Sequence, residues 1–158
     1  MNKLSDIFDI VYGNGYELIN LKKTSEGPNF VARTSKNNGV VGKVLKTNTE
    51  PFENGLITVS LGGSVLEAFL QDEPFYTAFH IYVLKPKKQM NNIEKLFYCM
   101  CINLNKYRYN YGRQANRTLG QIIVPDFSND FNFDEASKST IINYQNEINS
   151  IEKYLFKK

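Results

Sequence analysis

One segment of the chain, Asn105–Thr118, interleaves cations, tyrosines and amides in a pattern that suits contact with nucleic acid. Lysine and arginine side chains bind phosphates and release the counterions that surround the polyanion. Arginine, glutamine and asparagine can each form two hydrogen bonds with the edge of a guanine or an adenine. The residues of this segment that we expect to face DNA are Lys106, Arg108, Tyr111, Arg113, Gln114 and Arg117.

The distribution of charge supports this prediction more than the net charge of +3 does. Between Lys95 and Pro125 every charged residue is a lysine or an arginine, and the acidic residues lie elsewhere in the chain. A basic stretch in a nearly neutral chain is the electrostatic pattern expected for polyanion binding. The alternative that the segment leaves open is a solvated loop with its tyrosines packed underneath.

A second polar loop, Arg33–Gly39, offers similar side chains over a shorter stretch. Arg33, Lys36 and Asn37 are candidates for DNA contact because a loop of such residues can reach a groove. The Asn38-Gly39 pair is a strong signal for a tight turn. Polar loops of this composition also occur on surfaces that bind nothing, so an ordinary surface loop is the alternative.

Catalytic and metal-binding residues are few. The only histidine, His80, lies in an apolar run that favours a packed side chain over a general base. Cys99 and Cys101 are too close for an ordinary disulfide and lack a second pair for zinc, so we expect them to pack as small apolar groups. Gly62-Gly63 has no neighbouring Gly-Lys-Ser/Thr and predicts a hairpin turn instead of a phosphate loop. We therefore predict no catalytic centre, metal or cofactor.

The apolar pattern predicts a mixed α/β (α+β) domain. Ile93, Leu96, Met100 and Leu104 recur at helical spacing, which indicates a helix over about residues 92–105. The segment 1–11 fits either a short helix or an entry strand. Apolar, β-branched runs bounded by glycine, proline and asparagine predict strands over residues 29–33, 40–45, 55–61, 65–70, 81–84 and 119–124.

The C-terminal residues have a different pattern, and we place a domain boundary between residues 127 and 128. Asp134 is a plausible helix N-cap. Apolar residues then recur in steps of 3 and 4, as in a coiled-coil seam, at Ile141, Tyr144, Ile148, Ile151 and Leu155. The sequence predicts a spacer helix over 128–158 that pairs with a partner, and an amphipathic helix docked on residues 1–127 is the alternative.

Length and composition set the broad class. A chain of 158 residues with 42% hydrophobic and 22% charged residues suits one soluble globular domain. The N-terminus has no apolar signal segment, and no apolar run approaches the roughly 18 residues of a membrane span. We expect a cytoplasmic protein without a membrane partner.

The order of these segments resembles the target-recognition domain of DNA-specificity (S) subunits in type I restriction–modification systems, and the similar domains of type IIG and BcgI-like enzymes. No single motif carries the resemblance, which rests on an ordered set of segments. These are Lys3–Phe8, Asn29–Gly39, Asn54–Ser64, Pro74–Thr77, Tyr109–Leu119 and Ile122–Pro125.

The resemblance implies a small twisted, mostly antiparallel sheet domain that recognises a short half-site of double-stranded DNA through its loops. It also implies a long C-terminal coiled-coil-type helix that sets the distance between two half-sites. Full S subunits carry two such domains, so this chain resembles a half-subunit that dimerises through its tail, or one domain of a longer protein. The Asn/Asp-Pro-Pro-Tyr/Phe motif of a methyltransferase is absent, which assigns methylation and cleavage to partner subunits.

Two other functions remain open at this stage. One is a protein-interaction module, such as a decoy or an inhibitor of restriction subunits, that acts through the C-terminal helix. The other is a small enzyme that uses His80. Salt dependence separates the first from DNA binding, because binding to phosphates weakens steeply with salt.

Overall fold

The computed structural model describes residues 1–106 and 117–127. Residues Met1–Asp126 form one compact unit. The predicted spacer helix lies outside the described residues, with its seam residues Ile141, Tyr144, Ile148, Ile151 and Leu155. Four of the candidate DNA-contact residues also lie outside them, namely Arg108, Tyr111, Arg113 and Gln114.

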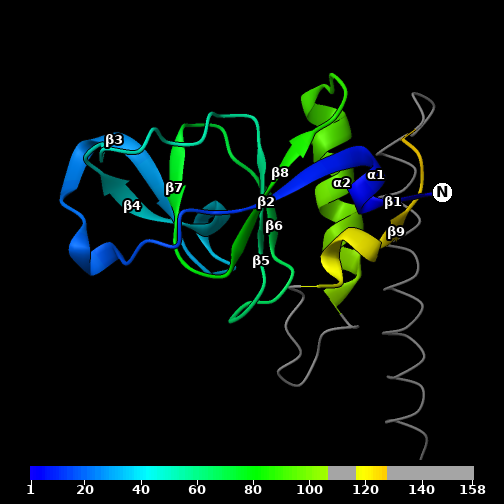
Figure 1. Ribbon diagram of the computed structural model, residues 1–158, viewed down its shortest axis with the longest axis horizontal. Helices are drawn as coiled ribbons and strands as arrows, with labels where there is room; N and C mark the ends of the chain where they lie inside the picture. Colours follow the sequence, from blue (N-terminus) through cyan, green and yellow to red (C-terminus); the bar gives the residue numbers. More distant parts are fainter. Residues whose placement is uncertain (107–116, 128–158) are drawn as a thin grey trace, which may run out of the picture. The chain divides into compact units, whose positions relative to one another are not determined.

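A four-stranded antiparallel sheet forms the middle of the unit (Figure 1). Its order is β2-β8-β5-β6, so β6 is an edge strand. Its strands are β2 (Phe8–Tyr12), β8 (Ile81–Pro86), β5 (Ile57–Ser60) and β6 (Ala68–Leu70). All four residues of β5 are buried, as expected for a strand rich in β-branched residues that lies inside a sheet.

A three-stranded sheet lies beside it, in the order β4-β3-β7. The strands are β4 (Val40–Val44), β3 (Lys23–Val31) and β7 (Phe75–Thr77). β3 runs antiparallel to β4 and parallel to β7. The prediction of a mixed α/β domain with mostly antiparallel sheet is therefore confirmed, with β3 and β7 as the parallel pair.

The N-terminus and the end of the described chain meet in a third, two-stranded sheet of β1 (Asn2–Lys3) and β9 (Ile123–Val124). The N-terminal segment contains both predicted alternatives, because the short helix α1 (Leu4–Ile7) is followed by β2. The predicted strand over 119–124 is partly wrong, since Leu119–Gln121 forms the 3-10 helix η4. Buried Leu119 and Ile122 hold this turn against the core.

The helix α2 (Asn92–Leu104) confirms the helix predicted from apolar spacing. It begins with a reciprocal capping box in which the Glu94 amide donates to Asn91 Oδ1 and the Asn91 amide donates to the Glu94 carboxylate, at 2.9 and 2.8 Å. Three of the four residues that marked the helix are nevertheless exposed: Ile93, Leu96 and Leu104. In the described part of the chain, no helix combines the length and apolar character needed to cross a bilayer.

Aromatic side chains fill the core where β3 meets β7. Phe30 and Tyr76 face each other in the parallel register, and both are buried with Phe75. The Tyr76 hydroxyl donates to the Thr49 carbonyl at 2.6 Å and accepts from the Thr47 amide at 3.1 Å. The core therefore ties the loop after β4 to the strand that supports β3. Two further short 3-10 helices are η1 (Leu18–Asn20) and η2 (Asn37–Gly39).

Candidate nucleic-acid interface

The Arg33–Gly39 loop connects β3 to β4 and presents its candidate side chains to solvent. Arg33, Lys36 and Asn37 are all exposed, while Asn38 is half-buried and Gly39 is buried. The base of the loop is closed by a hydrogen bond of 2.8 Å from the Ala32 amide to the Gly39 carbonyl. None of the ion pairs between described residues includes Arg33 or Lys36, which leaves both cations available to an anion.

The loop turns through three successive residues with left-handed backbone angles. The φ values are 48° at Asn37, 57° at Asn38 and 77° at Gly39. Asparagine and glycine tolerate this region best, so the Asn-Asn-Gly run suits the turn that the sequence predicted. Two side-chain hydrogen bonds support it, from Asn37 Nδ2 to the Val40 carbonyl at 3.0 Å and from Asn38 Nδ2 to the Leu70 carbonyl at 2.8 Å.

The glycine pair lies against this loop. β5 and β6 form the predicted hairpin, but a broad loop, residues 61–67, replaces the expected tight turn. Gly63 has φ +67°, and a Cβ at this position would lie 3.3 Å from Arg33 Cβ. Gly63 therefore permits the close approach of two loops that are separate in the sequence. No local signal links the two positions, because they are distant in the chain.

The same 61–67 loop also contacts the end of α2. Glu67, which has a 17% exposed side chain, forms an ion pair with Lys106. The loop thus has Arg33 beside Gly63 and Lys106 beside Glu67. Because Lys106 already has a carboxylate partner, it must exchange that partner to bind a phosphate. Arg117, at the other end of the undescribed stretch, is exposed just before η4.

His80 contributes to this region through its backbone. Its backbone is left-handed, with φ 60°, and its amide donates to the Tyr12 hydroxyl at 2.7 Å. Its carbonyl accepts from the Leu61 amide at 2.8 Å, which fixes the start of the 61–67 loop. The Nδ1 atom is buried without a partner among the described atoms. The backbone of His80 therefore acts as a support for the loop beside Arg33.

Cys99 and Cys101 are buried free thiols on α2, as the sequence predicted. Burial raises the pKa of Cys99 to about 12, with a further contribution from Cys101, and burial raises the pKa of Cys101 to about 11. Thiolate is the reactive form, so neither side chain is a nucleophile near neutral pH. Within the described residues, no group of three or more histidine, cysteine or acidic side chains is arranged to hold a metal.

These raised pKa values predict slow thiol chemistry. At about pH 8, each cysteine of the folded protein should react with a disulfide reagent at least about 10-fold more slowly than in the unfolded chain, because less thiolate is present and the greater nucleophilicity of a high-pKa thiolate offsets only part of that loss. The measurement is the absorbance change with an aromatic disulfide reagent, before and after addition of guanidinium. A thiol that reacts equally fast in both states would contradict the burial described here.

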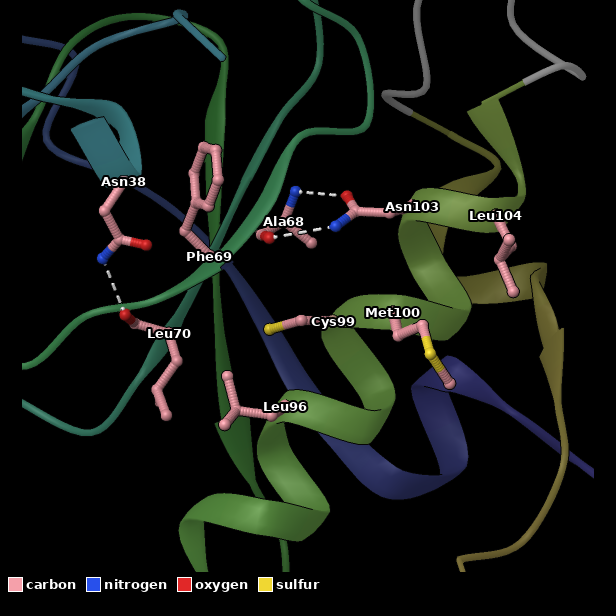
Figure 2. A pocket seen from close by; sticks show the side chains of 9 residues that line it. All are labelled: Asn38, Ala68, Phe69, Leu70, Leu96, Cys99, Met100, Asn103 and Leu104. Carbon is pink, nitrogen blue, oxygen red and sulfur yellow. Dashed lines mark hydrogen bonds between the residues drawn. The ribbon is translucent and has the colours of Figure 1, made fainter. Parts of the chain in front are cut away.

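An open groove of about 420 Å³ lies between β6 and α2 (Figure 2). Phe69 lines it from the strand, and Leu96, Cys99 and Met100 line it from the helix. Side-chain amides bind the two ends of β6. Asn38 donates to the Leu70 carbonyl. Asn103 accepts from the Ala68 amide at 2.8 Å and donates to the Ala68 carbonyl at 3.4 Å. Three outward polar groups of this edge strand, the Ala68 amide and the Ala68 and Leu70 carbonyls, are thus bound by side chains from the loop and the helix.

The chain is similar to proteins of restriction–modification systems. The specificity subunit S.BcgI of a type II restriction enzyme from Heyndrickxia coagulans is 21% identical over 115 residues, which is 73% of this chain and 34% of that protein. A type I S subunit from M. genitalium has a TM-score of 0.57 and 19% identity, covering 77% of this chain and 32% of the other. The HsdS subunit from Thermoanaerobacter tengcongensis has a TM-score of 0.56 and 11% identity, covering 98% and 39%.

The structural matches are all below 25% identity and establish a shared fold. This chain spans about a third of the length of the proteins named above. A family model, described as the type I restriction modification DNA specificity domain, matches residues 1–123. That match covers β1 to the start of β9, including the Arg33–Gly39 and 61–67 loops. The chain therefore belongs to the family of type I restriction–modification DNA specificity domains.

Proposed function

We propose that this chain recognises a short half-site of double-stranded DNA and directs partner subunits to it, without catalysing a reaction itself. The observation that carries the proposal is the exposed Arg33–Gly39 loop, in which two exposed cations precede a left-handed turn and Arg33 lies beside Gly63. Long cationic side chains on a fixed backbone can grip phosphates and set the position of neighbouring residues over the bases. Membership of the DNA-specificity family supports the same function.

The direct test is selection from a pool of random duplex DNA at moderate salt. The purified chain should enrich a short motif, which would be single for a monomer and a spaced inverted pair for a dimer. Enrichment of no motif despite binding would reduce the function to electrostatic attachment. Failure to bind even at low salt would refute the proposal.

The segment that contains Arg108, Tyr111, Arg113 and Gln114 keeps its predicted role in this proposal. Replacing Arg113 with alanine should weaken binding to the selected motif by about 1–3 kcal/mol if Arg113 bonds a guanine edge. Binding to an unrelated duplex should change much less. A titration of both duplexes with the variant checks this, and equal weakening on both would assign Arg113 to a phosphate.

The proposed partners are a methyltransferase subunit and an endonuclease subunit, with assembly through residues 128–158 acting as the spacer helix in a cytoplasmic complex. A solved structure of the type I restriction–modification system, which describes its complex assembly and is similar to this chain with a TM-score of 0.60 and 12% identity, supports a role in such a complex. We further propose that Ile141, Tyr144, Ile148, Ile151 and Leu155 pair with a second specificity domain or a second copy of this chain. Sedimentation of the wild type and of a seam variant such as Ile148→Asp tests the pairing.

A second candidate function is that of a protein-interaction module that binds restriction subunits as a decoy or an inhibitor. The observation in its favour is the exposed apolar side chains of α2, Ile93, Leu96 and Leu104. Apolar contact is insensitive to moderate salt, whereas binding to phosphates is not. Retention of a restriction subunit at high salt, together with no affinity for DNA at low salt, would favour this second function.

A further inference from the structure

The Arg33–Gly39 loop is fastened to the sheet by two amide side chains, and this attachment goes beyond the contacts expected of a surface loop. Asn38 Nδ2 donates to the Leu70 carbonyl at 2.8 Å, and Gln71 Nε2 donates to the Asn38 carbonyl at 3.0 Å. The two hydrogen bonds run in opposite directions between one loop residue and two successive residues at the end of β6. They join positions 32 and 33 residues apart in the chain.

Gln71 is an unusual residue to find at this place. Its side chain is completely buried. Besides its bond to Asn38, Gln71 Nε2 donates a second hydrogen bond to Thr58 Oγ1 at 2.9 Å. Its Oε1 atom has no partner among the described atoms. Burial of an unpaired carbonyl costs free energy, so an apolar residue of the same size would suit the core better. A polar side chain kept at such a cost indicates a role for the hydrogen bond to Asn38.

The loop conformation requires such an attachment. Asn37 and Asn38 both have left-handed backbone angles, which cost free energy in any residue other than glycine. Gly39, which follows them, has φ +77°, and a Cβ there would also lie only 3.1 Å from Val31 Cγ1, so a side chain at this position would be strained. The bonds from Asn38 and Gln71 compensate for the strain and hold this conformation in the absence of ligand. Arg33, Lys36 and Asn37 are then presented in one fixed geometry.

We propose that Asn38 and Gln71 are positioning residues for DNA recognition: they hold the Arg33–Gly39 loop so that it discriminates between DNA sequences. This inference rests on the proposed function. Neither residue needs to touch DNA. A loop released from β6 keeps its two cations and therefore its attraction for any duplex, but it loses the geometry that distinguishes one base sequence from another.

The test compares Gln71→Met and Asn38→Gly with the matched control Thr58→Val, all in the full chain. Gln71→Met preserves volume and removes the bond to Asn38, and Asn38→Gly keeps the left-handed backbone while removing the side-chain anchor. Thr58→Val removes the other partner of Gln71 and leaves the bond to Asn38 in place. Two duplexes serve as probes: the sequence selected by the wild type from a random pool, and a scrambled duplex of the same composition.

Both loop variants should lower the ratio of affinities for the two duplexes by about tenfold, the scale of one mismatched base pair, with affinity for the scrambled duplex changed by less than about twofold. Amide exchange at Ala32 and Gly39 should become faster in both. The Thr58→Val control should change neither quantity.

An unchanged ratio of affinities for the two duplexes in both loop variants would overturn the inference. An equal loss of that ratio in Thr58→Val would also overturn it, because the effect would then come from lower stability. If the wild type selects no sequence, the proposed function fails and the inference fails with it. The two failures are distinguishable because the wild-type selection is carried out first.

Discussion

Replacing Tyr76 with alanine should lower the free energy of unfolding by about 3–5 kcal/mol, the range found for large aromatic side chains in cores. The side chain extends from β7 and is fully buried, and its ring centroid lies 5.6 Å from that of Tyr16. Its hydroxyl also bonds Thr47 and Thr49. Truncation therefore creates a cavity and removes the hydrogen bonds to the Thr47 amide and the Thr49 carbonyl. Urea denaturation followed by circular dichroism measures the loss.

A conservative variant at the same position separates the two contributions. Tyr76→Phe keeps the ring and removes only the hydroxyl, so it should cost about 0.5–1.5 kcal/mol through the lost hydrogen bonds to the Thr47 amide and the Thr49 carbonyl. If Tyr76→Ala is no less stable than Tyr76→Phe, the ring contributes nothing to packing, in conflict with its burial. A larger loss of stability in Tyr76→Ala than in Tyr76→Phe would show that both the ring and the hydroxyl of Tyr76 stabilise the fold.

The double variant Arg33→Ala with Lys36→Ala, which neutralises both cations of the Arg33–Gly39 loop, should weaken DNA binding strongly. If each side chain neutralises one phosphate, the slope of log K against log salt concentration should fall in magnitude by about 1.8. Relative to a 1 M reference, this corresponds to about 60-fold weaker binding at about 0.1 M salt. The effect should shrink as the salt concentration rises. Fluorescence anisotropy of a labelled duplex over a range of salt concentrations measures both quantities.

The control for this experiment is a charge-matched pair at the other end of the same strand. Lys22 and Lys23 lie at the start of β3, and both are exposed. Lys22→Ala with Lys23→Ala changes the net charge equally but should leave the salt slope nearly unaltered. Similar losses in the two double variants would mean that net charge alone attracts DNA and that the Arg33–Gly39 loop is not the contact surface.

Several features of the fold follow from local sequence because the forces that produce them act over a few residues. Apolar spacing and the Asn91–Glu94 capping box are sufficient to place α2. The Asn38-Gly39 pair suits a left-handed turn since asparagine and glycine tolerate positive φ. The β-branched run around Ile57–Ser60 similarly forms a buried strand. The exposed cations at Arg33 and Lys36 were likewise identifiable as candidates from their types and spacing.

Other features depend on contacts between distant parts of the chain. Helical spacing identified α2 but not its buried face: Ile93, Leu96 and Leu104 are exposed while Phe97 and Ile102 are buried, because the neighbouring strands select which apolar side faces inward. Packing also turned Leu119–Gln121 into a 3-10 helix.

The candidate interface depends on distant contacts most of all. Gly63 lies against Arg33, Glu67 pairs with Lys106, and Gln71 bonds Asn38. A local pattern specifies a turn or a strand but carries no information on which remote segment will lie beside it. The candidate residues for DNA contact were thus predictable from their types and spacing in the sequence. The residues that hold the Arg33–Gly39 loop in place are identified only by the tertiary structure, because they come from distant parts of the chain.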